Sequence, residues 1–138
     1  MNTDLLERVI RHEGFKDKPF LDSEGVATIG HGLTFLTEEE SKRIVANRLE
    51  NFEMRLMNVE PDFFNALNQP EVLNILIEMS YQLGLQGCLN FRKMWAALKT
   101  KDYPTAADEM IDSQWHQQTP ERCEEMAGII RSLGNGIV

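Results

Sequence analysis

The sequence predicts a mainly helical α+β fold, and three observations lead to this prediction. Apolar residues recur at helical spacing before residue 14 and after residue 36. Between these limits the pattern changes to the period of two that is typical of strands. The chain has 138 residues, 42% hydrophobic and 26% charged, and contains no repeat or long linker. We therefore expect one domain over residues 1–138, with a small hairpin lobe at about residues 14–36 in a helical body.

The first predicted helix ends at Gly14, because glycine commonly follows a helix end. Asp4 and Glu7 have the spacing of a capping box, in which two side chains bond backbone N–H groups at a helix start. The apolar stripe of this helix consists of Leu5, Leu6, Val9 and Ile10.

A β-hairpin is predicted next, with strands at about residues 19–22 and 26–29. A two-residue loop would place Asp22 and Thr28 on opposite faces. A three-residue loop, 23–25, instead pairs Asp22 with Val26 and places Asp22 and Thr28 on one face. The third position of such a loop favours glycine, and Gly25 occupies it. We expect this register, with a positive φ at Gly25.

The remainder of the chain is predicted to be helical. Thr37 and Glu40 form a second capping box. The segment 72–79 is apolar on nearly every side, which indicates a central buried helix that ends at Gly84. Other helices are expected to begin at Pro61, at Pro70, at Asn90, after Asp102 and at Thr119-Pro120.

Composition limits the classes of function. With 14 basic and 22 acidic residues the net charge is −8, which argues against a nucleic-acid binder because phosphates would be repelled. No apolar run could span a bilayer, and no signal peptide or membrane anchor is visible. Cys88 and Cys123 lack metal-binding or redox spacing; they fit two free thiols in a reducing cytoplasm or, alternatively, one disulfide. No metal or organic cofactor is expected.

Glu13, Asp22 and Thr28 are candidate catalytic residues, although each has an ordinary structural explanation. Glu13 continues the apolar stripe of the first helix, and burial would raise its pKa toward that of a general acid. A solvated glutamate at a helix end is the alternative. Asp22 begins a turn, as aspartate often does, and threonine is common in strands.

Three motifs in a fixed order make the combination more specific. Glu13 lies in HEGF, Asp22 follows nine residues later, and Thr28 begins the segment TIGHG. Tyr81-Gln82-Leu83-Gly84 ends the central helix, and Trp115 precedes Thr119-Pro120-Glu121-Arg122. Together these motifs resemble the lysozymes of tailed bacteriophages, glycoside hydrolase family 24, over nearly the whole chain.

The resemblance implies a lysozyme-like fold and a muramidase that cleaves the β-1,4 bond between N-acetylmuramic acid and N-acetylglucosamine in peptidoglycan. Glu13 would protonate the glycosidic oxygen, and Asp22, helped by Thr28, would activate the attacking water. The family inverts the anomeric centre, for which carboxyl groups stand roughly 6.5–9.5 Å apart.

Supporting residues are implied by the same resemblance. Arg122 matches the position whose guanidinium pairs with the catalytic glutamate, and an ordinary surface arginine is its alternative. Tyr81 and Gln82 match positions that line the sugar groove; otherwise they are the polar end of a buried helix.

The sequence also departs from the family pattern. His31 lies between the two glycines, and Leu33 stands where the family commonly has a histidine. Glu78 stands in the central helix where a small polar or amide residue is usual. The short stretch from Gly32 to Thr37 predicts a reduced hairpin lobe.

Partners and location follow as expectations from the resemblance. We expect a monomer that acts on bacterial peptidoglycan from the host cytoplasm, after a holin-like protein has permeabilised the inner membrane, or alternatively as part of a virion. A lytic transglycosylase, an inactive wall-binding module and a structural helical adapter are alternative functions. The net charge of −8 is the best support for the inactive wall-binding module, because phage endolysins that act on anionic walls are often basic.

Overall fold

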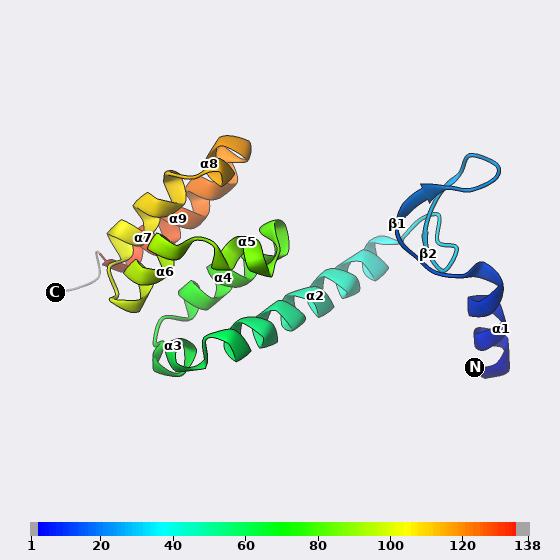
Figure 1. The fold of residues 1–138 in the computed structure, drawn as a ribbon, viewed down its shortest axis with the longest axis horizontal. Helices are drawn as coiled ribbons and strands as arrows, with labels where there is room; N and C mark the ends of the chain where they lie inside the picture. Colours follow the sequence, from blue (N-terminus) through cyan, green and yellow to red (C-terminus); the bar gives the residue numbers. More distant parts are fainter. Residues whose placement is uncertain (1–2, 135–138) are drawn as a thin grey trace. The chain divides into compact units, whose positions relative to one another are not determined.

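The structure, a computed structural model, describes residues 3–134 and separates the chain into two units, Met1–Val45 and Ala46–Val138 (Figure 1). The N-terminal unit contains helix α1 (Thr3–Glu13), strands β1 (Lys16–Leu21) and β2 (Ala27–Gly30), and the start of helix α2 (Glu38–Val59), which continues into the C-terminal unit. The remaining elements are helices. The predicted mainly helical α+β class is therefore confirmed.

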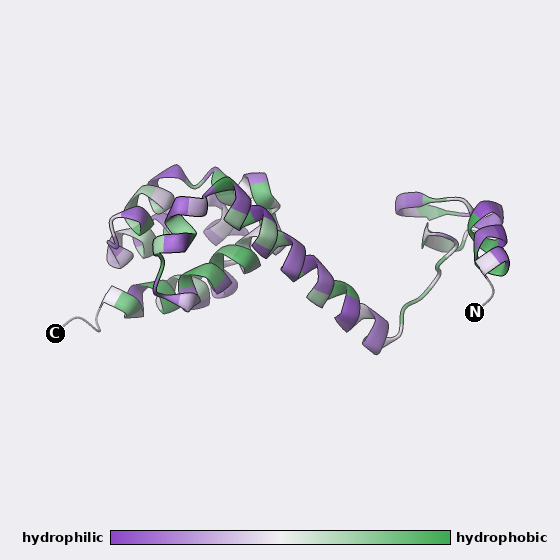
Figure 2. Cartoon of the chain, turned by 90° about the horizontal axis from the view of Figure 1, so that it is seen from below, coloured by the Kyte–Doolittle hydropathy of each residue, from purple (hydrophilic) through white to green (hydrophobic). Residues whose placement is uncertain are grey.

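Helix α1 is amphipathic, and hydrophilic and hydrophobic residues are both present along it in Figure 2, beside the N label. It ends at Glu13, since Gly14 has a φ of +67° and donates its N–H to Ile10 O at 2.9 Å. The predicted capping box is wrong in position. The helix already includes Thr3, so Asp4 lies in its first turn, where its negative charge suits the helix dipole.

The hairpin has the expected three-residue loop. Strands β1 and β2 are antiparallel, with Leu21 opposite Ala27 and Phe20 opposite Thr28. Asp22 N–H donates to Val26 O at 2.9 Å. Gly25 has a φ of +80°, which confirms the predicted conformation of the loop's last residue.

Helix α2 begins with the predicted capping box. Thr37 N–H donates to Glu40 Oε1 at 3.0 Å, and Glu40 N–H donates to Thr37 Oγ1 at 3.1 Å. The backbone N–H and the side chain of Thr37 both stabilise the Glu40 carboxylate and lower its pKa.

The C-terminal unit consists of the end of α2 and seven further described helices. Several begin where proline or aspartate predicted: Pro61 and Pro70 are first helical residues, and Asp102 accepts the Thr105 N–H at 3.2 Å. The helices are α3 (Pro61–Ala66), α4 (Pro70–Leu83), α5 (Leu85–Leu89), α6 (Arg92–Lys99), α7 (Tyr103–Ile111), α8 (Gln114–Gln118) and α9 (Pro120–Gly134).

One predicted helix start in the C-terminal unit is also wrong. Helix α6 begins at Arg92 and not at Asn90, which instead follows the short helix α5. The Asn90 side-chain oxygen accepts a hydrogen bond from Gln86 Nε2 at 2.8 Å, across the end of α5. The backbone therefore completes a separate turn before α6 begins.

The core of the C-terminal unit lies where α4, α7 and α9 pack together, and α7 and α9 run side by side in Figure 1. Helix α4 is buried along most of its length, as predicted, and Gly84 ends it with a φ of +82°. The three helices contribute Val72, Ile75, Leu76, Met79, Tyr103, Ala106, Ala107, Met110, Cys123, Met126, Ala127 and Ile130 to the core.

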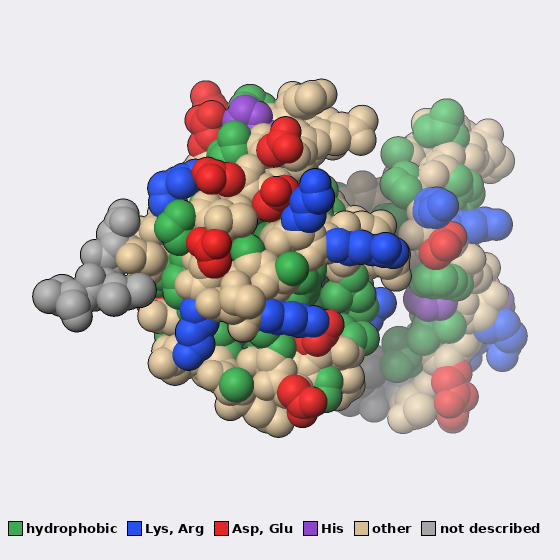
Figure 3. Space-filling model, turned by 60° about the vertical axis from the view of Figure 1, so that its left-hand side comes forward, with side chains coloured by type: hydrophobic (Ala, Val, Ile, Leu, Met, Phe, Trp, Pro, Cys, Tyr) green, Lys and Arg blue, Asp and Glu red, His purple; other side chains and the backbone are tan. Residues whose placement is uncertain are grey.

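Both cysteines are free thiols in this core, so the alternative of one disulfide is wrong. Cys88 Sγ lies 3.7 Å from Leu76 O, and Cys123 Sγ lies 3.3 Å from Met110 O. Burial raises the pKa of each thiol to about 11. Acidic and basic side chains are interspersed on the face of the C-terminal unit in Figure 3. None of the helices described is both long and apolar enough to cross a membrane.

Candidate active site

Glu13 is the last residue of α1, and its carboxyl group lies against the backbone of Gly32. A methyl group at Gly32 would overlap Glu13 Oε2 and come within 2.7 Å of Cδ. Only glycine leaves this space free. Within the N-terminal unit the apolar stripe does not enclose Glu13, because all residues of α1 are exposed.

Asp22 and Thr28 lie on one face of the hairpin, as the register of β1 and β2 requires. Asp22 Oδ1 accepts the N–H groups of Glu24 at 2.9 Å and Val26 at 2.8 Å. The loop therefore uses one carboxylate oxygen and leaves Oδ2 outside these bonds. Thr28 is 8% exposed and donates its hydroxyl hydrogen to Val26 O at 3.0 Å.

The segment after β2 forms a tight loop beside the end of α1. Ile29 and Leu33 exchange both backbone hydrogen bonds at 2.9 Å, which encloses a loop of Gly30, His31 and Gly32. Both glycines have positive φ values, +64° and +76°. Because the carboxyl group of Glu13 touches Gly32, this loop belongs to the Glu13 site.

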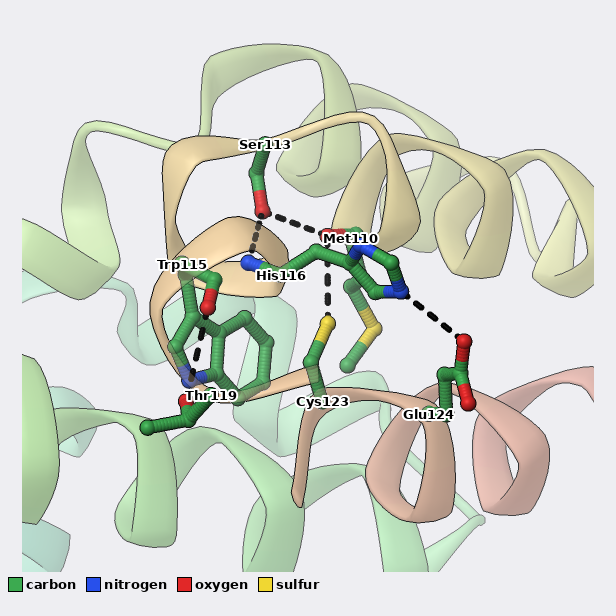
Figure 4. Close-up of polar contacts among 7 residues, drawn as sticks. All are labelled: Met110, Ser113, Trp115, His116, Thr119, Cys123 and Glu124. Carbon is green, nitrogen blue, oxygen red and sulfur yellow. Dashed lines mark hydrogen bonds and ion pairs between the residues drawn. The ribbon is translucent and has the colours of Figure 1, made fainter. Parts of the chain in front are cut away.

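Gln82 is held in one orientation in the C-terminal unit. Its Oε1 accepts a hydrogen bond from Trp115 Nε1 at 3.0 Å, and its Nε2 donates to Thr119 Oγ1 at 3.1 Å. Figure 4 shows Trp115 and Thr119 at the two ends of the short helix α8. Tyr81, the preceding residue, is 38% exposed.

Helix α8 is itself well anchored, which fixes Trp115. Ser113 Oγ accepts the His116 N–H at 3.2 Å and donates to Met110 O at 2.6 Å (Figure 4). The His116 ring meets Glu124 Oε1 at 2.9 Å. Trp115 also borders a cavity of about 550 Å³ and meets the ring of Phe91 nearly at right angles.

Arg122 is paired with Glu78 in the structure. Its Nε donates to Glu78 Oε2 at 2.9 Å, and both side chains are about half exposed. Glu78, the departure from the family pattern noted above, is therefore charge-compensated. The pairing of Arg122 with Glu13 that the family resemblance implies stays a prediction.

The predicted site residues thus fall into two sets. Glu13, Asp22 and Thr28 belong to the N-terminal unit. Tyr81, Gln82 and Arg122 belong to the C-terminal unit.

The sequence did not predict that Gly32 contacts Glu13 or that His31 lies in the same loop. It also did not predict that Trp115 and Thr119 orient Gln82. All four lie in the quoted motifs, which was the available signal. Among residues 3–134, no group of three or more His, Cys, Asp or Glu side chains is placed to hold a metal ion.

Comparison with known proteins identifies the family of this chain. The model of the family described as phage lysozyme matches residues 10–132. The chain is 32% identical over 57 residues to probable T4-type lysozyme 1 of Dictyostelium discoideum, covering 41% of this chain and 34% of that protein. It is 26% identical over 159 aligned positions to the pre-baseplate central spike protein Gp5 of Enterobacteria phage T4, covering 94% of this chain and 28% of that protein.

The chain spans about a third or less of the length of both relatives. The family match nevertheless covers most of the chain, including Glu13, the hairpin and Arg122. This protein belongs to the phage lysozyme family.

Proposed function

We propose that this protein is a muramidase that hydrolyses the β-1,4 bond between N-acetylmuramic acid and N-acetylglucosamine in peptidoglycan, with inversion. Membership of the phage lysozyme family supports peptidoglycan hydrolysis in general. The hairpin register carries the finer proposal, because it puts Asp22 and Thr28 on one face, where both can contact a single water. Glu13 is the proton donor to the leaving oxygen.

The hydrogen bonds of the hairpin suggest how that water is oriented. Thr28 uses its hydrogen for Val26 O, so toward a water its oxygen accepts. Asp22 Oδ2 also accepts. A water that donates one hydrogen to each oxygen directs its lone pairs away from both, toward the anomeric carbon. Asp22 then removes the proton as bond formation proceeds.

The C-terminal unit supplies substrate-binding groups in this proposal. Tyr81 offers an exposed ring, and the Gln82 amide is pre-oriented by Trp115 and Thr119. Aromatic faces and fixed amides suit a polar, ring-shaped ligand such as a glycan. Arg122 belongs to the same unit, where its Nε is held by Glu78 Oε2 at 2.9 Å.

The decisive test uses Glu13→Gln with Glu24→Gln as the matched control, because Glu24 is an exposed carboxylate in the hairpin loop. On purified peptidoglycan, Glu13→Gln should lose at least ~10²-fold in kcat, as expected for a lost general acid. Glu24→Gln should retain wild-type turnover. Full activity in Glu13→Gln would end the proposal.

Product analysis separates hydrolysis from the alternatives. An inverting hydrolase releases a reducing sugar as the α-anomer, which NMR detects before mutarotation. An anhydro product would instead identify a lytic transglycosylase. Tight binding to the wall without product would identify a wall-binding module.

The setting of the activity has two candidates. As an endolysin, the protein would act from the host cytoplasm and require a holin-like permeabiliser, so expressing cells should stay intact until their inner membrane is breached. The similarity to the T4 spike protein over 94% of this chain favours a second candidate, a lysozyme unit that acts within a virion. Immunodetection in purified virions would support the second candidate.

A further inference from the structure

His31 stands at the middle of the loop that contacts Glu13. The flanking residues Ile29 and Leu33 are bonded to each other through both backbone groups, so the loop contains only Gly30, His31 and Gly32. A loop this short has little freedom to move independently of its ends. A contact made by His31 therefore holds the loop and its two ends together as one piece.

The His31 ring binds the residues that directly follow Glu13. Its Nδ1 lies 2.9 Å from Gly14 O, and because a carbonyl oxygen only accepts, Nδ1 is the donor. The ring centre also lies 5.2 Å from that of Phe15, at an angle of 46°. Gly14 N–H is already bonded to Ile10 O. Gly14, the residue after Glu13, is thus held by α1 through its N–H and by His31 through its carbonyl oxygen.

We propose that His31 is a positioning residue for Glu13. Its hydrogen bond fastens the glycine loop to the end of α1, and this attachment keeps Gly32 in contact with the Glu13 carboxyl group. The proposal rests on the proposed function, in which Glu13 is the proton donor. The position where the family commonly has a histidine is Leu33 in this chain, so His31 acts from a different place in the loop.

The expected effects on folding and on turnover distinguish a positioning role of His31 from a role in stability. His31 and Phe15 are both exposed, so water replaces their contacts readily and the hydrogen bond contributes little to folding. Misplacing a catalytic group by about 1 Å can cost on the order of 10²-fold in rate. Loss of the bond should therefore affect turnover far more than the unfolding temperature.

Two substitutions separate the donor from the ring. His31→Phe keeps an aromatic ring against Phe15 but removes the Nδ1 donor. His31→Asn removes the ring but retains an N–H donor close to the position of Nδ1. His12→Asn is the matched control, since His12 is an exposed histidine of α1 beside Glu13.

We expect His31→Phe to lower kcat at least tenfold on soluble peptidoglycan fragments, with KM and the unfolding temperature nearly unchanged. His31→Asn should restore most of the turnover, and His12→Asn should match the wild type. Wild-type kcat in His31→Phe would overturn the proposal. An equal loss in His31→Asn would overturn it too, because the ring rather than the donor would then matter.

A second measurement keeps this inference distinct from the proposed function. In labelled protein, the ¹³C signal of the Glu13 carboxyl carbon and the amide signal of Gly32 should shift in His31→Phe and return toward wild type in His31→Asn. Unchanged signals in His31→Phe would refute the positioning role even if Glu13→Gln is inactive. An inactive wild-type protein would refute the proposed function, and the NMR shifts would still decide whether His31 positions Glu13.

Discussion

Replacing Gly32 with alanine tests the contact on which the Glu13 site depends. The added methyl group would overlap Glu13 Oε2 and lie 2.7 Å from Cδ and 3.1 Å from Cγ. Carbon atoms in contact are ordinarily about 3.5–4.0 Å apart. The carboxyl group must therefore move by about 1 Å, a displacement that can cost on the order of 10²-fold in rate.

The same substitution also strains the backbone, and a control is needed to separate the two effects. Gly32 has a φ of +76°, a conformation that costs an alanine about 1–2 kcal/mol. Gly30 has a φ of +64° in the same loop, but a methyl group there would meet only the Leu33 side chain, at 3.4 Å. Gly30→Ala therefore carries similar backbone strain without displacing Glu13.

Turnover on purified peptidoglycan and urea unfolding should be measured for both variants. We expect both to lose about 1–2 kcal/mol of stability, and only Gly32→Ala to lose on the order of 10²-fold in kcat. Equal kcat values in the two variants would refute the reasoning, because strain alone would then explain the result.

Four further predictions concern other parts of the chain. Gly25→Val should disturb the hairpin loop, because Gly25 has a φ of +80°, and should lower turnover without changing a catalytic group; wild-type turnover would contradict this. Thr37→Ala should lower the unfolding temperature by a few degrees at neutral pH. The effect should shrink as the pH falls below the ordinary glutamate pKa of 4.5 and through the lowered pKa of folded Glu40, because the carboxylate that Thr37 stabilises is then protonated. The thiols of Cys88 and Cys123 have pKa values of about 11 in the folded protein, against an ordinary value of 9.0, so the unfolded thiols ionise first as the pH rises. The free energy of unfolding measured in urea should therefore fall between pH 9 and pH 11, and a flat profile would refute this. Clearing of anionic walls should improve as salt rises from low values, because a net charge of −8 repels the wall over a Debye length of about 10 Å at 0.1 M; faster clearing at the lowest salt would indicate a local basic patch.

Features governed by neighbouring residues could be predicted from the sequence. The capping box of Thr37 and Glu40 needs only a spacing of three residues. The prolines at positions 61 and 70 have φ values that suit a first helical turn. Gly25 specified the hairpin loop, and through it the face shared by Asp22 and Thr28.

The short helices could not be predicted, for an equally physical reason. Helices α5 and α8 have five residues each, which is too few for an apolar stripe to repeat. Isolated helices of this length are also unstable, so packing decides whether they form. Gly87 inside α5 and Ser113 before α8 favour turns equally well.

The contacts that orient the site residues were also beyond local reasoning. Glu78 and Arg122 are 44 residues apart, and His31 and Gly14 are 17 residues apart. Nothing in the sequence near Arg122 indicates that Glu78 is its partner. The family resemblance named the important positions, but the partner of each side chain depends on the packed helices.

Asp22 Oδ1 accepts two backbone hydrogen bonds, from Glu24 and Val26, and we call this pair the fork. The fork shapes the hairpin loop, and the same carboxylate is the proposed catalytic base, so few residues could replace Asp22. One oxygen of the carboxylate organises the loop, and the other is left for the water. Asparagine can keep the fork only by turning its carbonyl oxygen to the loop, which presents an NH₂ donor where an acceptor is needed. Alanine removes both functions, and glutamate is too long for a bond to N–H groups two and four residues ahead. A substitution of Asp22 therefore alters both the hairpin loop and the proposed catalytic base. Sequence changes that disrupt this loop are expected to lower turnover as well.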